Sequence, residues 1–176
     1  MSGIIEATNL QTANIKHTNG TTAMTIDSTG RILTPARPAF RVEKRASSQS
    51  ISDSTNTKIT FEHEVFDIGS NFASDKFIAP VAGIYQFNAC LRCVASGGTM
   101  ELAAIYLYKN GSHFTDIVQM QTSANNMSNS HISGGVTLQL SASDYIEIYG
   151  NISGTSPSVH HHSSGQRTWF SGFLIG

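Results

Sequence analysis

The chain is poor in charged residues. Only 13% of its 176 residues are Asp, Glu, Lys or Arg, and the formal net charge is −1. Lys and Arg are scattered apart from a small group at Arg41, Lys44 and Arg45, whereas a nucleic-acid-binding surface requires a basic stripe. We therefore expect no nucleic-acid partner. Ser, Thr, Asn and Gly are abundant instead, which suits a secreted or particle-borne β protein with many turns.

Long apolar runs are also missing. The sequence contains no run of the about 18 apolar residues that a membrane-spanning helix needs, so no membrane insertion is expected. Residues 1–6 lack the basic and apolar regions of a secretory signal peptide. A protein that leaves its cell on a virus particle after lysis would need no such signal.

Cysteine is scarce, with Cys90 and Cys93 as the two examples. Both fall within a predicted strand, so their side chains point to opposite faces, with about 10 Å between them along the chain. A disulfide needs Cα atoms within about 7 Å, and no second CxxC completes a zinc site. We interpret Cys93 as a small core residue and Cys90 as a packing residue on the other face.

Convincing helical periodicity is absent, and short alternating runs with frequent turn signals predict a sandwich or jelly roll. The chain is organised around residues 77–87. Phe77 and Ile78 end one strand, Pro80 closes it because proline cannot donate to a ladder, and a long strand begins at Ile84. Further strands are predicted at 39–42, 59–61, 65–66, 100–109, 114–118, 131–140, 145–149 and 168–175.

Residues 1–36 differ from the rest because they are rich in Thr and Asn and carry few large apolar side chains. Turn signals at 19–20 and 27–30 flank a short alternating strand at 23–26. This segment cannot bury enough surface to fold alone. It is either a flexible tail or an attachment segment ordered by partners, and its regular turns favour attachment. We therefore divide the chain into an attachment or oligomerisation segment, residues 1–36, and a head, residues 37–176.

Some strands of the predicted head are apolar on both faces. In the last strand Trp169 and Phe173 share one face, and Phe170 shares the other with Leu174. An antiparallel sheet in a monomer usually has one face exposed to water. A strand that is apolar on both faces therefore indicates that a second subunit covers the outer face. We predict a closed homo-oligomer with these contact residues: Tyr106, Tyr108, Trp169, Phe170 and Phe173.

Six segments of the head occur in the order of a known family. They are residues 38–40, 66–72, 77–87, 107–111, 135–148 and 169–175, of which 77–87 is the most specific. Together they resemble the globular head of the complement C1q family, which shares the trimeric jelly roll of the tumour necrosis factor ligands. The resemblance implies an all-β, ten-stranded jelly-roll sandwich that assembles as a homotrimer.

Two departures from that family are visible. Ser143-Asp144 stands where the family usually has Gly-Asp, and no Gly-X-Y collagen repeat precedes the head. In composition and turn pattern, residues 19–31 instead resemble the attachment regions of bacteriophage fibre proteins. Combined with the missing signal peptide, this similarity indicates a phage virion, with the protein on its exterior.

Seven histidines raise the question of a metal or catalytic site. His160, His161 and His162 are consecutive, and on a three-fold axis they could form a ring that binds a transition metal or an anion. No Ser-His-Asp spacing, paired acids or phosphate loop stands out, so we expect no enzyme. We also expect no cofactor, with calcium or a transition metal kept as alternatives.

The resulting hypothesis is a virion fibre or spike. Its trimeric head binds a glycan or protein of the host surface, and residues 1–36 dock on other virion proteins. The proposed contact residues lie in two polar loops: Ser123, Asn125, Asn126, His160, His161, His162 and Gln166. A capsid decoration or tail adaptor with a purely structural role is the alternative, and a secreted, extracellular lectin-like module is a further one.

Overall fold

The computed structural model describes residues 12–123, 127–164 and 167–176. The backbone divides into two compact units, residues 1–37 and 38–176. This boundary lies one residue from the predicted one, beside the prolines at positions 35 and 38.

The N-terminal unit is a small antiparallel sheet of β1 (Asn14–Lys16), β2 (Thr22–Ile26) and β3 (Ile32–Leu33). The predicted strand at 23–26 lies within β2. Asp27 orders the turn before β3, because its Oδ1 accepts the backbone N–H of Arg31 at 3.0 Å. The backbone and side chain of Arg31 lower the pKa of Asp27 to about 2.

No residue in the described part of this unit is buried. Ile32, for example, keeps 64% of its surface exposed. Residues 12–37 therefore form well-defined turns but no hydrophobic core among themselves, as their composition predicts.

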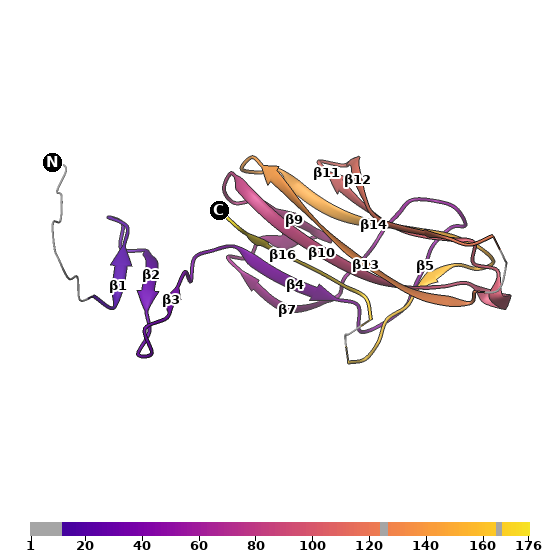
Figure 1. Ribbon diagram of the computed structural model, residues 1–176, viewed down its shortest axis with the longest axis horizontal. Helices are drawn as coiled ribbons and strands as arrows, with labels where there is room; N and C mark the ends of the chain where they lie inside the picture. The colour runs from indigo at the N-terminus through magenta and orange to yellow at the C-terminus, as the bar shows by residue number, and fades with distance from the viewer. Residues whose placement is uncertain (1–11, 124–126, 165–166) are drawn as a thin grey trace. The chain divides into compact units, whose positions relative to one another are not determined.

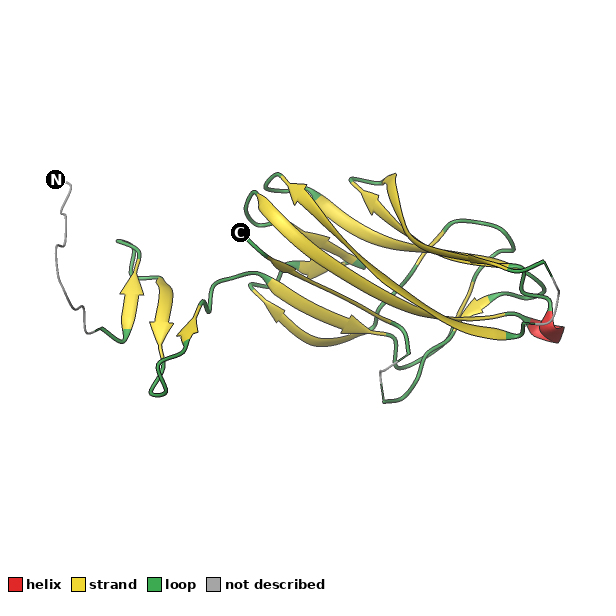
Figure 2. Ribbon diagram, viewed as in Figure 1, coloured by secondary structure: helices red, strands yellow, loops and turns green. Residues whose placement is uncertain are grey.

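The head is built from two antiparallel sheets that face each other across a shared core (Figures 1 and 2). The first has seven strands: β4 (Ala39–Glu43), β5 (Gln49–Ser50), β7 (His63–Ile68), β10 (Gly83–Val94), β13 (Asn129–Leu140), β15 (Ser158–Val159) and β16 (Trp169–Leu174). The second includes β8 (Phe72–Ala73), β9 (Lys76–Ile78), β11 (Leu102–Lys109), β12 (Ser112–Gln121) and β14 (Tyr145–Ser153), with β6 (Thr57–Lys58) paired to β14. A short 3₁₀ turn, η1 (Ser96–Gly98), lies at one end of the sandwich (Figure 2).

The described part of the head has thirteen strands rather than the predicted ten. Four of the thirteen, β5, β6, β8 and β15, are only two residues each. Such short strands carry no periodicity of their own and form only where a neighbour offers backbone partners. The strand predicted at 59–61 is wrong, because those residues are irregular backbone, although Ile59 and Phe61 still enter the core.

The first and last strands of the head lie side by side. β16 pairs with β4 on one side and with β10 on the other, and Phe173 lies opposite Ala39. The chain therefore enters the head and ends at the same end of the sandwich, opposite η1 (Figure 1).

The core is centred on phenylalanine rings from both sheets. The Phe40 ring stacks on that of Phe77 with 4.9 Å between centroids, and meets the edge of Phe170 at the same distance. Gly172 makes room for this cluster, because a Cβ atom there would lie 2.5 Å from Phe87. Residues 77–87 therefore shape the scaffold, with Phe77 and Phe87 in its core.

The basic group noticed in the sequence is fully ion-paired. Arg41 Nε lies 2.9 Å from Glu43 Oε1, and Arg45 Nη2 lies 2.7 Å from Glu43 Oε2. Lys44 is only 2% exposed, and its Nζ lies 3.3 Å from Glu62 Oε2. Burial raises the pKa of Glu62, but the Ala46 backbone N–H and the Lys44 ammonium outweigh burial and lower it.

The two cysteines are free and point to opposite faces of β10, as their spacing predicts. Cys93 is completely buried in the core, and burial raises the pKa of its thiol to about 12. Cys90 lies on the outer side, where its Sγ donates to the Arg167 carbonyl oxygen at 3.4 Å. Burial also raises the pKa of Cys90, so neither thiol is poised for redox chemistry.

In the parts of the chain that the structure describes, no helix has the length and apolarity to cross a membrane.

Candidate functional site

The outer surface of the seven-stranded sheet carries exposed apolar side chains. Side chains alternate along β16, so Phe170 points into the core while Phe173 points outward and is 45% exposed. Ile84 at the start of β10 and Ile175 after β16 are exposed beside it, because the Ile175 N–H donates to the Ile84 carbonyl.

The edge strand β7 extends this apolar surface. Phe66 lies opposite Arg41 and Ile68 lies opposite Ala39, and both apolar side chains are exposed. We name this set the apolar face: Phe66, Ile68, Ile84, Phe173 and Ile175. Trp169 lies next to it and is covered by Arg41, whose Cζ is 4.7 Å from the ring centroid.

The outer surface of the six-stranded sheet has a different chemistry. Tyr106 lies directly opposite Tyr149, and the Tyr108 ring stacks on Tyr149 with 3.7 Å between centroids. His113 packs edge-on against Tyr106 and Tyr108, at 5.3 and 5.6 Å. We name Tyr106, Tyr108, His113 and Tyr149 the tyrosine cluster. Burial, followed by the nearby charge of Asp116, raises the pKa of Tyr106.

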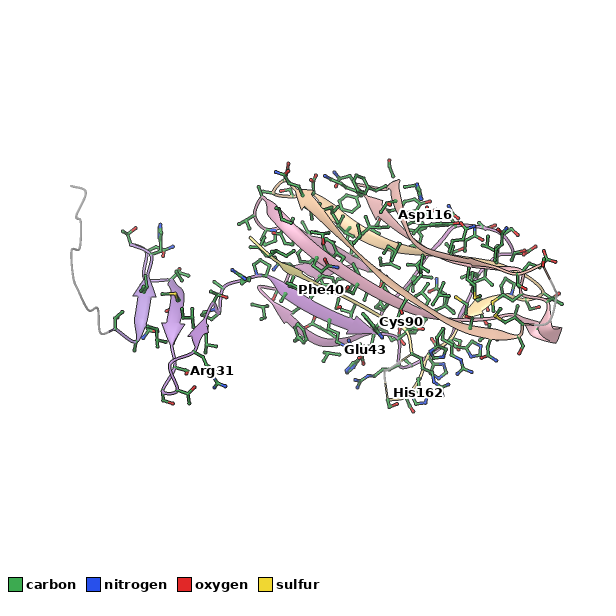
Figure 3. All side chains as sticks on the ribbon, in the orientation of Figure 1. Arg31, Phe40, Glu43, Cys90, Asp116 and His162 are labelled. Carbon is green, nitrogen blue, oxygen red and sulfur yellow. The ribbon has the colours of Figure 1, made fainter. Side chains whose placement is uncertain are left out.

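The predicted interface residues therefore do not form one surface. Phe170 is 0% exposed and belongs to the core, so its assignment to a subunit interface is wrong. Tyr106 and Tyr108 lie on the opposite sheet from Trp169 and Phe173. Figure 3 shows this separation, with Glu43 and Asp116 on opposite sides of the sandwich and Phe40 between them. Alternation along a strand predicts which residues share a face, but not which sheet the strand joins.

A groove runs along the outer surface of the six-stranded sheet toward the loop after β12. It consists of two hollows of about 420 Å³ and about 260 Å³. Glu101 and Gln121 line both hollows, Ser123 lines the larger one, and Tyr106 and Asn151 line the smaller one. We name it the polar groove. Strand pairing explains its composition, because Leu102, which lines the smaller hollow, lies opposite both Gln121 and Ser153.

A chain of amide hydrogen bonds connects the groove to the tyrosine cluster. Asn151 Nδ2 donates to Asn56 Oδ1 at 2.7 Å, and Asn56 Nδ2 donates to the Tyr108 hydroxyl at 3.1 Å. Asn151 Oδ1 is buried and has no hydrogen-bond partner among the described residues. Because an unpaired buried carbonyl is unfavourable, this oxygen indicates a place for an additional donor.

Charged groups beside the groove are mostly paired. Lys58 Nζ lies 2.8 Å from Glu147 Oε1, and His113 Nε2 lies 2.8 Å from Asp116 Oδ1. Glu101, which lines both hollows, is exposed.

The structure places the predicted binding residues that it describes in different parts of the head. Ser123 lines the groove. Asn125, Asn126 and Gln166 lie outside the described residues. The three consecutive histidines lie elsewhere, at the side of the head beside the end of β4, because the His162 N–H donates to the Lys44 carbonyl (Figure 3).

The histidine run does not form a metal centre within one chain. His161 Nδ1 is 3.0 Å from Ser48 Oγ, and His162 Nδ1 contacts the Ser164 hydroxyl. Burial, and then His161, lowers the pKa of His160. Across the described residues no three His, Cys, Asp or Glu side chains gather closely enough to hold a metal ion. A ring around a three-fold axis stays a prediction, and the structure assigns no calcium ligands.

The sequence did not single out Glu101, Gln121 and Asn151 as site residues. The alternation of β14 places Asn151 on its outward side, which is the one local signal available. Nothing local connects it with Glu101 and Gln121, because the three residues meet only through the pairing of β11 with β12 and β14.

Taken together, the two facing sheets and the adjacent first and last strands define a jelly-roll head. The family model of the C1q domain matches residues 39–175. The chain therefore belongs to the C1q domain family.

Solved structures support this fold. The head is similar to the globular domain of zebrafish complement 1qA protein, at 18% identity and a TM-score of 0.55, over 80% of this chain and 98% of that one. Eiger TNF from S. frugiperda matches at 8% identity and a TM-score of 0.61, over 80% and 94% of the two chains. Murine APRIL matches at 13% identity and a TM-score of 0.54, over 79% and 99%.

A relative found by sequence belongs to a phage-like element. The chain is 30% identical over 112 residues to the phage-like element PBSX protein XkdV of Bacillus subtilis (strain 168), which covers 57% of this chain. The chain spans only 16% of the length of that protein.

Proposed function

We propose that this protein is a trimeric appendage of a phage or phage-like particle, whose C1q-type head binds the host cell surface and whose N-terminal unit docks on the particle. The observation that carries the proposal is the contrast between the two outer surfaces of the head. One is apolar and suits self-association, and the other holds a polar groove and suits a ligand. The similarity to the phage-like element protein supports the setting on a particle exterior.

The homotrimer rests on the apolar face and on the C1q family membership. Phe66, Phe173 and Ile84 are large apolar side chains on one surface of the sandwich, exposed in the single chain. Removing such a surface from water is favourable by about 25 cal/mol per Å². In a trimer, the three copies cover one another and leave the opposite sheets facing outward.

Docking through residues 1–36 rests on the absence of a core in that unit. Its described residues form hydrogen-bonded turns and a small sheet but bury no side chain. A sheet with exposed Ile32 and Leu33 gains stability when a partner covers it. A virion protein or the sister chains supply that cover.

The proposed role is binding without catalysis. The described groove residues carry amides, hydroxyls, one carboxylate, one leucine side chain and one tyrosine ring, and none of these described groups forms an activated nucleophile or an acid–base pair. A structural role as a decoration or adaptor protein is the alternative, and the same N-terminal unit would serve it.

Adsorption measurements separate the two roles. Fluorescently labelled full-length protein is incubated with a panel of bacteria that includes Bacillus subtilis, and bound fluorescence is measured by flow cytometry. Saturable binding to at least one strain is expected, together with competition by unlabelled protein. If every strain fails to bind, and particles lacking the protein adsorb normally but lose integrity, the structural role replaces the host-binding role.

A further inference from the structure

We propose that the polar groove binds a short neutral oligosaccharide, with Tyr106, Gln121, Asn151 and Glu101 as its main contacts. The inference rests on the proposed host-binding function and names its ligand class. It also gives a new role to Tyr106, which belongs to this groove and not to a subunit interface.

The charge of the groove selects against anionic ligands. Glu101 contributes a carboxylate to both hollows, and no Lys, Arg or His is among the described residues that line them. Lys58, on β6 of the same sheet, already neutralises Glu147 at 2.8 Å. A phosphate, sulfate or sialic acid group would meet the like charge of Glu101 here. A neutral sugar instead donates hydroxyl hydrogens to the Glu101 carboxylate.

The hydrogen-bonding groups match the hydroxyls of a sugar. A hydroxyl is both donor and acceptor, and the amides of Gln121 and Asn151 supply both functions. Asn151 Nδ2 is already bound to Asn56, while Asn151 Oδ1 is buried without a donor among the described residues. A sugar hydroxyl in the smaller hollow satisfies this oxygen once the Asn151 side chain, which lines that hollow, turns to expose it.

An aromatic ring completes the site. Tyr106 lines the smaller hollow and is held in place by the edge of His113 at 5.3 Å. The apolar C–H side of a pyranose ring can pack against this tyrosine while its hydroxyls reach the neighbouring amides. His113 is in turn fixed by Asp116 at 2.8 Å, so the ring is positioned before a ligand arrives.

The dimensions favour a short chain of sugar rings over a protein. The two hollows meet at Glu101 and Gln121, with volumes of about 420 and 260 Å³. Together they reach the size range of small-ligand sites. A single shallow site of this kind binds weakly, and three copies on one trimer raise the avidity.

The test uses the full-length protein and defined probes. Maltotetraose, cellotetraose, chitotetraose and mannotetraose are titrated by calorimetry and by NMR, with sialyllactose as the anionic comparison. Binding of at least one neutral tetrasaccharide is expected with a dissociation constant of about 1 mM or tighter. Sialyllactose is expected to bind at least about tenfold more weakly.

Substitutions in the polar groove test whether the tetrasaccharide binds there. Tyr106→Ala and Asn151→Ala are each expected to weaken binding of the same tetrasaccharide at least about tenfold. Phe114→Ala is the matched control, because Phe114 is a 52% exposed aromatic residue on β12 that lines neither hollow. Glu101→Gln and Gln121→Ala change exposed side chains, so they test the groove even if Asn151→Ala unfolds.

Each outcome decides one proposal. If the protein binds cells but no neutral tetrasaccharide, the oligosaccharide inference is overturned and host binding stands. Stronger binding of sialyllactose, or tetrasaccharide binding that the groove variants leave unchanged, also overturns it. If a neutral tetrasaccharide binds in the groove but no cell does, the inference holds and the host-binding function fails.

Discussion

On the outside of the seven-stranded sheet, the outward side chains of β16 and its neighbours include Phe173, Ile175 and Ile84, each about half exposed. On the outside of the six-stranded sheet, the corresponding positions of β11 and β14 are Tyr106, Tyr149 and Asn151, tied together by ring contacts and amide hydrogen bonds. Both surfaces belong to the same sandwich and share one core. The difference teaches that one shared core can carry two outer surfaces of unlike chemistry, to which we assign the proposed self-association and the proposed ligand binding.

The largest expected effect is the loss of assembly when the apolar face receives a charge. Phe173→Glu would bury an unpaired carboxylate in each subunit contact, which is strongly unfavourable. Light scattering is expected to give a trimer for the full-length protein and a monomer for this variant. Circular dichroism should show an unchanged fold, because Phe173 is exposed in the single chain.

Phe114→Glu provides the comparison, since Phe114 is exposed on β12, outside the apolar face. It is expected to leave the trimer intact. A monomeric wild-type protein, or a trimeric Phe173→Glu variant, would contradict the assignment of the apolar face to self-association.

A smaller effect is expected inside the core, where the two sides of β16 can be compared directly. The added methyl group of Gly172→Ala would lie 2.5 Å from Phe87 and 2.9 Å from Phe40. Overpacking of this kind lowers the free energy of unfolding by about 1–3 kcal/mol. Urea denaturation followed by Trp169 fluorescence measures it.

Ser171→Ala is the matched control, because Ser171 is the preceding residue and points to the outer surface. Its unfolding midpoint should stay close to that of the wild type. Equal destabilisation by the two variants would show that the inward and outward sides of β16 are wrongly assigned.

The tyrosine cluster should contribute less. Tyr149→Leu removes the ring that stacks on Tyr108 at 3.7 Å, and such pairs contribute about 0.5–1.5 kcal/mol. A double-mutant cycle with Tyr108→Leu isolates the coupling from the other effects of each substitution. Strictly additive changes in unfolding free energy would show that the stacked pair has no stabilising role.

The smallest effect is a dependence of stability on pH at Asp144, in the turn before β14. Hydrogen bonds from Lys109 and Asn110 lower the pKa of Asp144 from 3.8 to about 2. The carboxylate therefore stabilises the fold above pH 3.8, and this contribution is lost as pH falls toward 2. Thermal melts between these pH values should show a steeper decline for the wild type than for Asp144→Asn. Equal declines in melting temperature for the two proteins would show that Asp144 does not contribute to the pH dependence of stability.

Local pattern predicted most of the long strands. The alternation after Pro80 and Gly83 placed a strand at 84–94, and β10 spans Gly83–Val94. The last strand was predicted at 168–175, and β16 spans Trp169–Leu174. The predicted strand at 114–118 is longer in the structure, because β12 pairs with β11 along almost its whole length. Pairing with β11 therefore extends this strand beyond the residues whose alternation predicted it.

The candidate site was only partly predictable. Ser123 was chosen as a polar loop residue and does line the groove. Lys44 stood out in the sequence only as part of a small basic group, yet it is buried against Glu62, which lies eighteen residues away. Tyr106 and Tyr108 were predicted as subunit contacts, but their contacts with His113 and Asn56 come from other strands and loops of the same chain.

The sequence by itself determined the all-β class, the C1q-like signature at 77–87, the lack of a core in the N-terminal segment and the alternation that separates the two sides of each strand. These are local properties, set by side-chain period, proline and glycine positions and composition. Only the tertiary structure decided which sheet each strand joins, and therefore that Phe170 is core, Phe173 is apolar surface and Tyr106 lines a groove. The physical reason is that a strand has two sides of its own, but what each side faces depends on partners far away in the chain.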